Sequence, residues 1–290
     1  MAQKDVLDRF YTQGDVVDAC LAYLAEETGV GYDRFAVIIE PSAGSGAFSS
    51  RLPARRLAYD ICPADGADGI EKRDWFSVTR DEVLRHAQAR AGGGMSQSQG
   101  HEVLVAGNPP FGLRSSVAKR FVAHAIEVGA TTIAFILPDI FSKMSNQRCF
   151  PDEWRLVGVL GLRRDAFTID GEPYHVPCSF FVWTCSDDIM PGRDLRETPI
   201  AQPKEFSYLR RGDAKAHFSL NGNSGRVKDI SDITNPKAEH YIRVSDGYDV
   251  NEIREKLTAL DLSFKSSANG GVAWANRDDI NRAWIAQYGE

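Results

Sequence analysis

Two kinds of apolar pattern alternate along the chain from about residue 10 to residue 190. Residues 15–27 carry apolar side chains at helical spacing, whereas residues 35–39 form a continuous β-branched run, as in strands buried on both faces. The same alternation predicts further strands at 56–60, 102–106, 131–137, 156–160 and 179–184, and helices at 82–90 and 116–128. Strands that alternate with helices predict an α/β fold with a mostly parallel sheet covered on both faces.

Two segments interrupt this alternation. Residues 91–100 are rich in Gly, Ser and Gln, which predicts a flexible insertion at the sheet edge opposite the strand carboxyl ends. Residues 186–203 are polar and contain several prolines, as linkers do. We therefore expect a first domain over 1–190, a linker over 191–203 and a small α+β region over 204–290. In that last region, strands are predicted at 206–209 and 240–244, and helices at 250–260 and 277–288.

Composition is that of a globular protein: the chain has 290 residues, of which 43% are hydrophobic and 26% charged. No apolar run approaches the roughly 18 residues of a membrane span, and no apolar signal segment follows the N-terminus, so we expect a cytoplasmic protein without membrane contact. The five cysteines form no C-x-x-C pair and the histidines lack ligand spacing, so no metal site is expected. A net charge of −6 disfavours nucleic-acid binding over the whole surface but permits a local basic face.

A glycine-containing motif follows the first predicted strand, with the sequence Glu40-Pro41-Ser42-Ala43-Gly44-Ser45-Gly46-Ala47-Phe48. Glycines let the backbone turn sharply and approach a ligand closely. Asp60 comes twenty residues after Glu40, at the end of the next strand, where a carboxylate can bind two ribose hydroxyls. Because position 49 is Ser and Glu40 repels phosphate, the motif favours a nucleoside cofactor with an ammonium group over a diphosphate.

A more specific motif, Asn108-Pro109-Pro110-Phe111, follows the strand predicted at 102–106. The two prolines fix φ and remove two N–H donors, so the rigid turn presents the Asn108 side-chain oxygen and the Pro109 carbonyl as neighbouring acceptors. Two adjacent acceptors suit a planar NH2 group, and Phe111 adds an aromatic face on which a flipped base can stack. A proline turn with Phe111 in the core is the alternative structural interpretation.

With these motifs in this order, the sequence resembles the class I S-adenosylmethionine-dependent amino-methyltransferases of nucleic acid, in particular those with an N-P-P-F/Y motif that methylate N6 of adenine. The resemblance covers about residues 10–185, and the order of cofactor motifs, catalytic motif and target region is that of the gamma group. It implies a Rossmann-like methyltransferase fold with a seven-stranded, mostly parallel sheet, S-adenosylmethionine as cofactor, and flipping of the target base.

The resemblance also implies roles for individual residues. Residues 10–12 are similar to the element that contacts the methionine end of the cofactor, although Gln13 stands where many relatives have Pro, and residues 74–76 are similar to the element near the cofactor adenine. The implied cofactor-binding residues are Tyr11, Thr12, Glu40, Pro41, Ala43, Gly44, Gly46, Phe48, Asp60, Ile61, Asp74, Trp75 and Asn108. The implied catalytic residues are Asn108, Pro109, Pro110 and Phe111, and Phe111 and Phe180 are expected to stack on the target base.

Basic side chains gather in two segments. Residues 112–164 contain eight basic and four acidic side chains, and residues 204–228 contain six basic and two acidic ones. Phosphate contact is the natural interpretation, and a chance cluster of solvated charges is the alternative. We expect contact with nucleic acid from Arg114, Lys143, Arg163, Arg164, Arg210 and Arg211.

The sequence therefore predicts an S-adenosylmethionine-dependent adenine-N6 methyltransferase acting on DNA. RNA is the nearest alternative substrate. N-P-P-Y motifs also serve protein-glutamine methylation, where the acceptor is again a planar amide, and a non-enzymatic binding subunit is a further alternative. The basic segments, and Phe111 in place of Tyr, favour a nucleic-acid base. Because the region after residue 203 is small, we expect modest or short-site specificity, or a partner that supplies it.

Overall fold

The computed structural model describes residues 10–29, 31–91, 102–169, 171–196, 200–262 and 274–289. The chain divides into two compact units, residues 1–197 and residues 198–290. The insertion predicted at 91–100 lies outside the described residues, apart from the backbone of residue 91.

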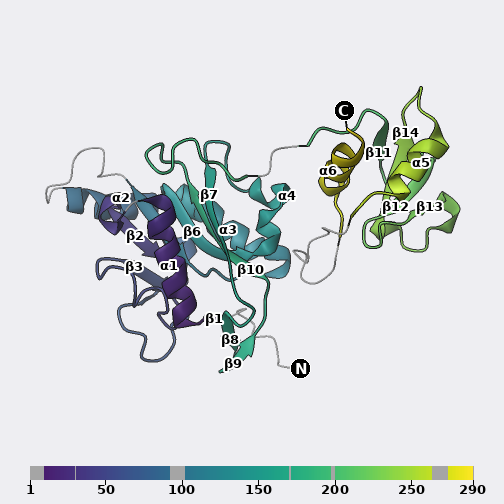
Figure 1. Cartoon of the computed structure of the whole chain (residues 1–290). Helices are drawn as coiled ribbons and strands as arrows, with labels where there is room; N and C mark the ends of the chain where they lie inside the picture. Colours follow the sequence, from purple (N-terminus) through teal and green to yellow (C-terminus); the bar gives the residue numbers. More distant parts are fainter. Residues whose placement is uncertain are drawn as a thin grey trace. The chain divides into compact units, whose positions relative to one another are not determined.

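A seven-stranded sheet forms the centre of the first unit (Figure 1), with strand order β4-β3-β2-β5-β6-β10-β7. Neighbouring strands from β4 to β6 run parallel, and β10 is antiparallel to both β6 and β7. The strands are β2 (Val37–Glu40), β3 (Leu57–Asp60), β4 (Glu71–Lys72), β5 (Val103–Gly107), β6 (Thr132–Pro138), β7 (Arg155–Gly161) and β10 (Cys178–Thr184). This arrangement confirms the predicted Rossmann-like methyltransferase fold.

Helices cover both faces of this sheet. Alternate residues of the buried strands belong to different apolar clusters: Val103 and Val105 pack with α2 and α3, whereas Leu104 and Ala106 pack with α1. Burial on both faces is the reason why these strands are continuous apolar runs in the sequence. The helices are α1 (Gly14–Thr28), α2 (Arg80–Ala91), α3 (Ser116–Glu127) and α4 (Met144–Gln147), with short 3₁₀ turns η1 (Tyr32–Arg34), η2 (Trp75–Ser77), η3 (Leu113–Ser115) and η4 (Asp139–Ser142).

A separate three-stranded antiparallel sheet joins the start of the described chain to a hairpin. Its order is β1 (Tyr11–Thr12), β8 (Phe167–Ile169) and β9 (Glu172–Tyr174), and Figure 1 shows the three strands side by side. Tyr11 pairs with Thr168, and the Gln13 N–H donates to the Ala166 carbonyl at 3.0 Å. Sequence patterns did not predict these strands, because two or three residues are too few to show a period.

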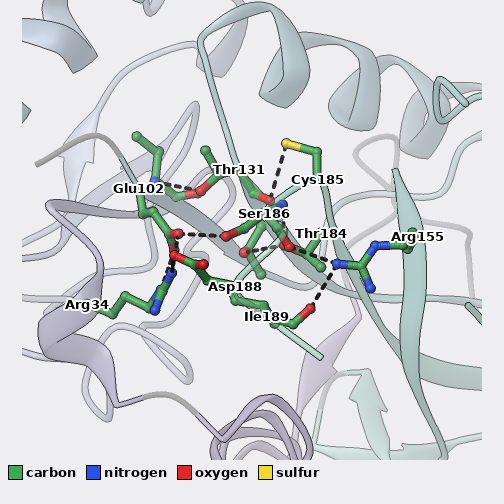
Figure 2. A network of polar contacts seen from close by, with 11 residues as sticks. Arg34, Glu102, Thr131, Arg155, Thr184, Cys185, Ser186, Asp188 and Ile189 are labelled. Atoms are coloured by element: carbon green, nitrogen blue, oxygen red, sulfur yellow. Dashed lines mark hydrogen bonds and ion pairs between the residues drawn. The ribbon is translucent and has the colours of Figure 1, made fainter. Parts of the chain in front are cut away.

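At the end of the main sheet where β2 and β5 begin, a polar network connects the segments before these strands to the segment after β10 (Figure 2). The Arg34 guanidinium donates to both carboxylate oxygens of Glu102, at 2.8 and 2.9 Å, and the Ser186 hydroxyl donates to Glu102 at 2.7 Å. The Arg155 guanidinium donates to four backbone carbonyls between residues 186 and 193, at 2.6 to 2.9 Å. Arg155 therefore ties the segment after β10 to the edge strand β7.

The second unit is a small α+β fold. Its antiparallel sheet has the order β11-β14-β12-β13, and α5 and α6 contribute to its apolar cluster around Phe218, Ile242 and Trp284. Its elements are β11 (Phe206–Leu209), β12 (Phe218–Asn221), β13 (Val227–Lys228), β14 (Glu239–Val244), α5 (Val250–Thr258) and α6 (Arg277–Tyr288), with 3₁₀ turns η5 (Ile230–Asp232) and η6 (Pro236–Ala238).

Candidate active site

A pocket with a cavity volume of about 240 Å³ opens where β2, β3 and β5 end. It brings together most of the site residues predicted from the sequence, although they come from distant parts of the chain. The predicted residues that line it are Tyr11, Thr12, Glu40, Pro41, Ala43, Gly44, Phe48, Asp60, Ile61, Asp74, Trp75, Asn108, Pro109 and Pro110. Gly46, Phe111 and Phe180 are not part of this lining.

Glu40 lies at the end of β2 and presents a buried carboxylate to the pocket. Its Oε2 atom has no hydrogen-bond partner among the described residues, and the residue is only 2% exposed. Burial raises the pKa of Glu40 to about 8, although hydrogen bonding to Ser49 acts in the opposite direction. An unpaired buried carboxylate oxygen is unfavourable unless a ligand satisfies it, so the site fits a cationic group such as an ammonium.

The glycine turn after β2 is held by the acidic residue at the end of β3. Asp60 accepts the N–H of Gly44 at 2.8 Å through Oδ2 and the N–H of Cys62 at 2.7 Å through Oδ1. Gly44 has φ of 54°, a conformation that disfavours residues with a side chain. Because each carboxylate oxygen can accept more than one hydrogen bond, Asp60 retains capacity for ligand hydroxyls.

The segment after β4 forms another wall of the pocket. Asp74 accepts the Phe76 N–H at 3.0 Å and so caps the turn η2. Phe76 itself lines the pocket together with Val117 and Phe121, which lie four residues apart on α3. Sequence reasoning included Phe76 in the element near the cofactor adenine without naming it as a site residue, and it missed Val117 and Phe121. The spacing of Val117 and Phe121 was visible, but such spacing marks any buried helix face.

The Asn108 carboxamide, directly after β5, is oriented by the first described residues of the chain. Its Nδ2 donates to the Phe10 carbonyl at 3.2 Å and to the Thr12 hydroxyl at 3.1 Å. The Ser42 hydroxyl donates to the Asn108 backbone carbonyl at 3.1 Å. The remaining polar atom, Oδ1, is buried without a hydrogen-bond partner in the described part of the chain. The pocket therefore carries a second unpaired buried acceptor.

Aromatic rings continue from this site toward the surface. Phe10 stacks on Phe111, with ring centroids 5.7 Å apart, and on Tyr174, with centroids 5.3 Å apart. Phe111 is 6% exposed and belongs to the apolar cluster of α1, which agrees with the alternative interpretation of a proline turn with Phe111 in the core. Tyr174, in contrast, is 42% exposed. The hairpin β8–β9 thus places a solvent-facing aromatic ring near the catalytic motif, which the sequence motifs did not indicate.

The expectation that Phe180 stacks on the target base is wrong. Phe180 lies within β10, between Ile136 of β6 and Leu160 of β7, and is fully buried. Its ring stacks on Phe48 at 6.4 Å, inside the apolar cluster of α1. A side chain at this depth has no access to a nucleic-acid base.

The predicted nucleic-acid contacts fall into different environments. Lys143 is buried, so it does not form the expected exposed contact. Arg163 forms ion pairs with Asp15 at 2.8 Å and Asp165 at 2.6 Å. Arg164 is exposed, as are Arg210 and Arg211 of the second unit, and the Arg114 side chain lies outside the described structure. Arg163 and Arg164 belong to the first unit, and Arg210 and Arg211 belong to the second.

Two searches of the described residues gave negative results. No group of three or more His, Cys, Asp or Glu side chains in that part of the chain is placed to hold a metal ion. None of the helices formed by those residues has the length and apolar composition of a membrane span.

Comparison with known proteins gives a family model and a plant relative. Residues 52–156 match the model of the EDM2 methyltransferase-like domain. The chain is 26% identical over 264 residues to Protein ENHANCED DOWNY MILDEW 2 of Arabidopsis thaliana. The match covers 84% of this chain, and the chain spans only 18% of the length of that relative.

Among solved structures, similarity is found to a candidate RNA methyltransferase from Pyrococcus horikoshii, with 16% identity, a TM-score of 0.42, and coverage of 61% of this chain and 87% of that one. A second similar structure is the type IIL restriction-modification enzyme MmeI in complex with DNA, with 12% identity, a TM-score of 0.34, and coverage of 90% and 53%. The family match over residues 52–156, together with the observed strand order, supports a methyltransferase-like domain in this chain.

Proposed function

We propose that this chain transfers the methyl group of S-adenosylmethionine to the N6 amino group of adenine in DNA. The observation that carries the proposal is that Glu40 Oε2 and Asn108 Oδ1, two buried acceptors of residues that line the same pocket, have no hydrogen-bond partner among the described residues. One suits the ammonium group of the cofactor, and the other suits a planar amino group of the substrate. An unpaired buried acceptor costs about 1–3 kcal/mol, which a ligand donor would offset.

Five of the residues that line the pocket have a defined role in this proposal. S-adenosylmethionine, when bound, supplies a strongly electrophilic methyl group on a sulfonium sulfur. Glu40 would bind the ammonium group, Asp60 would accept hydrogen bonds from the ribose hydroxyls, and Phe76 would contact the cofactor adenine. Asn108 and the Pro109 carbonyl would accept hydrogen bonds from the target amino group. These bonds would orient the nitrogen for attack on the methyl group and favour its more tetrahedral, nucleophilic form.

The choice of nucleic acid is supported by the exposed arginines and by the aromatic rings near the catalytic motif. Arg164, Arg210 and Arg211 are exposed and can contact phosphate. A base taken out of a duplex needs aromatic stacking to offset a few kcal/mol of unstacking, and Tyr174 is the exposed ring next to Phe10. We therefore assign the exposed stacking role to Tyr174 in place of Phe180.

The test is transfer of labelled methyl from S-adenosylmethionine to duplex DNA, single-stranded DNA, total RNA and protein in parallel, followed by nucleoside analysis. We expect N6-methyl-2′-deoxyadenosine in the DNA samples. Label only in RNA would overturn the assignment of DNA while leaving the chemistry in place. Label only in protein would indicate glutamine methylation, and cofactor binding without any transfer would indicate a binding subunit.

A further inference from the structure

The orientation of the Asn108 carboxamide is set by a different element from the one that carries it. Asn108 follows β5, but both hydrogen bonds of its Nδ2 atom go to β1 or the residue before it: to the Phe10 carbonyl at 3.2 Å and to the Thr12 hydroxyl at 3.1 Å. The sequence separations are 98 and 96 residues. β1 and the residue before it therefore contact the Asn108 side chain directly.

The chemistry of these two partners decides which way the amide points. A carbonyl oxygen can only accept, so the NH2 group and not Oδ1 must face Phe10. The Thr12 hydroxyl accepts from the same nitrogen and occupies its second hydrogen. Rotation of the amide by 180° would place Oδ1 against the Phe10 carbonyl, so that two acceptors would face each other. The NH2 group would then occupy the position that Oδ1 has in the structure. The observed orientation leaves Oδ1 as the unpaired acceptor.

Contacts with the β8 region hold β1 in place. Tyr11 and Thr12 pair with Thr168 and Phe167, and the Gln13 side chain donates to the Asp165 carbonyl at 2.7 Å. Arg163 extends this connection by donating to Gln13 Oε1 at 2.9 Å. Gln13 thus connects the two segments.

We propose that Thr12 is a positioning residue, whose hydroxyl fixes the Asn108 amide so that Oδ1 accepts a hydrogen bond from the substrate amino group. The catalytic consequence rests on the proposed function, whereas the orientation itself does not. Thr12 also lines the pocket, so its contact with Asn108 has to be separated by experiment from any contact with cofactor.

The test compares Thr12→Val, which removes the acceptor with little change in shape, with Thr12→Ser, which restores it. Thr168→Val is the matched control, because the Thr168 hydroxyl donates to the Tyr11 carbonyl at 3.5 Å in the same small sheet. Turnover at saturating cofactor is measured on the substrate that the wild-type chain methylates. Solvent exchange of the Asn108 side-chain NH2 is followed by NMR with ¹⁵N-labelled asparagine, assigned by its loss in Asn108→Asp.

We expect Thr12→Val to lower kcat about tenfold, the effect of one net hydrogen bond, and to speed exchange of the Asn108 amide protons. Thr12→Ser and Thr168→Val should stay close to wild type in both measurements. Unchanged amide exchange in Thr12→Val would overturn the proposal, as would equal loss of kcat in Thr168→Val. If the wild-type chain methylates no nucleic acid but the exchange result holds, the proposed function is wrong and the positioning of Asn108 stands.

Discussion

The backbone N–H of Gly44 donates to Oδ2 of Asp60 at 2.8 Å. The glycine turn after β2 and the acidic end of β3 are therefore one structural unit, although their residues are sixteen positions apart. Sequence reasoning treats the glycines and the acid as two separate ligand contacts. A change in Asp60 is therefore expected to alter the glycine turn as well, and both line the pocket.

Asp60→Asn should weaken S-adenosylmethionine binding by at least about tenfold. The asparagine side chain has one acceptor oxygen, so the N–H of either Gly44 or Cys62 loses its partner, and a ribose hydroxyl loses an acceptor. Isothermal titration calorimetry measures the affinity. Asp65→Asn, which changes an exposed carboxylate in the following loop, is the control and should bind normally. Equal affinities in the two variants would contradict the role of Asp60.

Cofactor affinity should rise with pH up to about pH 8. The pKa of Glu40 is raised by burial to about 8, so the free protein must lose a proton at Glu40 before an ammonium group can pair with the carboxylate. This coupling predicts a rise of up to about tenfold per pH unit below pH 8. Titrations between pH 6 and pH 8 test it. Glu40→Gln should bind weakly and without this pH dependence, and a pH-independent wild-type affinity would contradict the assignment.

The same group predicts the opposite trend for the stability of the ligand-free protein. Because the folded-state pKa of Glu40 is raised above its usual value of 4.5, its contribution to stability is complete below pH 4.5 and is lost as pH rises toward 8. Glu40→Gln removes this loss, so the variant should have the higher Tm at pH 8, with a smaller difference at pH 5. Thermal unfolding at both pH values provides the control for the binding experiment.

Asn108→Ala should lower the rate of methyl transfer by at least about a hundredfold while leaving cofactor affinity within a few-fold of wild type. The substitution removes the acceptor that we propose for the reacting amino group, and losses of this kind cost about 10²–10³ in rate. Single-turnover transfer and cofactor titration on the same preparation separate the two effects. Full residual transfer would show that Asn108 is not the acceptor.

Arg155→Lys should lower the free energy of unfolding of the first unit by about 3 kcal/mol. The guanidinium donates to four backbone carbonyls in the segment after β10, of which the contacts with Ser186 and Ile189 can be followed in Figure 2, and an ammonium group cannot reach the same set. Urea denaturation measures the change. Arg164→Lys alters an exposed arginine and should leave the unfolding midpoint unchanged. If both variants unfold alike, the network has no net stabilising effect.

Gly222→Ala should destabilise the second unit by about 2 kcal/mol. A Cβ atom at position 222 would lie only 2.6 Å from the Trp274 ring, so the ring or the turn must move. Hydrogen exchange of residues 218–244, followed by mass spectrometry, reports on this unit alone. Gly161→Ala, where a Cβ meets open space, is the control and should leave exchange unchanged. Normal protection in Gly222→Ala would show that Trp274 adapts without cost.

Six of the seven strands of the main sheet could be predicted from the sequence because they are largely buried apolar runs, whereas the exposed two-residue strand β4 was not predicted. The predicted strand and helix ends lie within two residues of those observed. The predictions that failed concern the burial of individual side chains and the pairing of short strands. An aromatic residue at 180 and a lysine at 143 have the expected chemical type, but residue type alone does not distinguish a buried position from an exposed one. The strands β1, β8 and β9 gave no signal because pairing between distant segments, not local periodicity, defines them.

The pairing of β1 with β8 makes folding and catalytic competence separable in this chain. A version that begins at Gly14 would keep α1 and every strand of the seven-stranded sheet. It would lack the Phe10 carbonyl and the Thr12 hydroxyl, which are the two partners of the Asn108 amide. If the proposed function holds, removal of residues 1–13 should therefore lower methyl transfer while the seven-stranded sheet is retained.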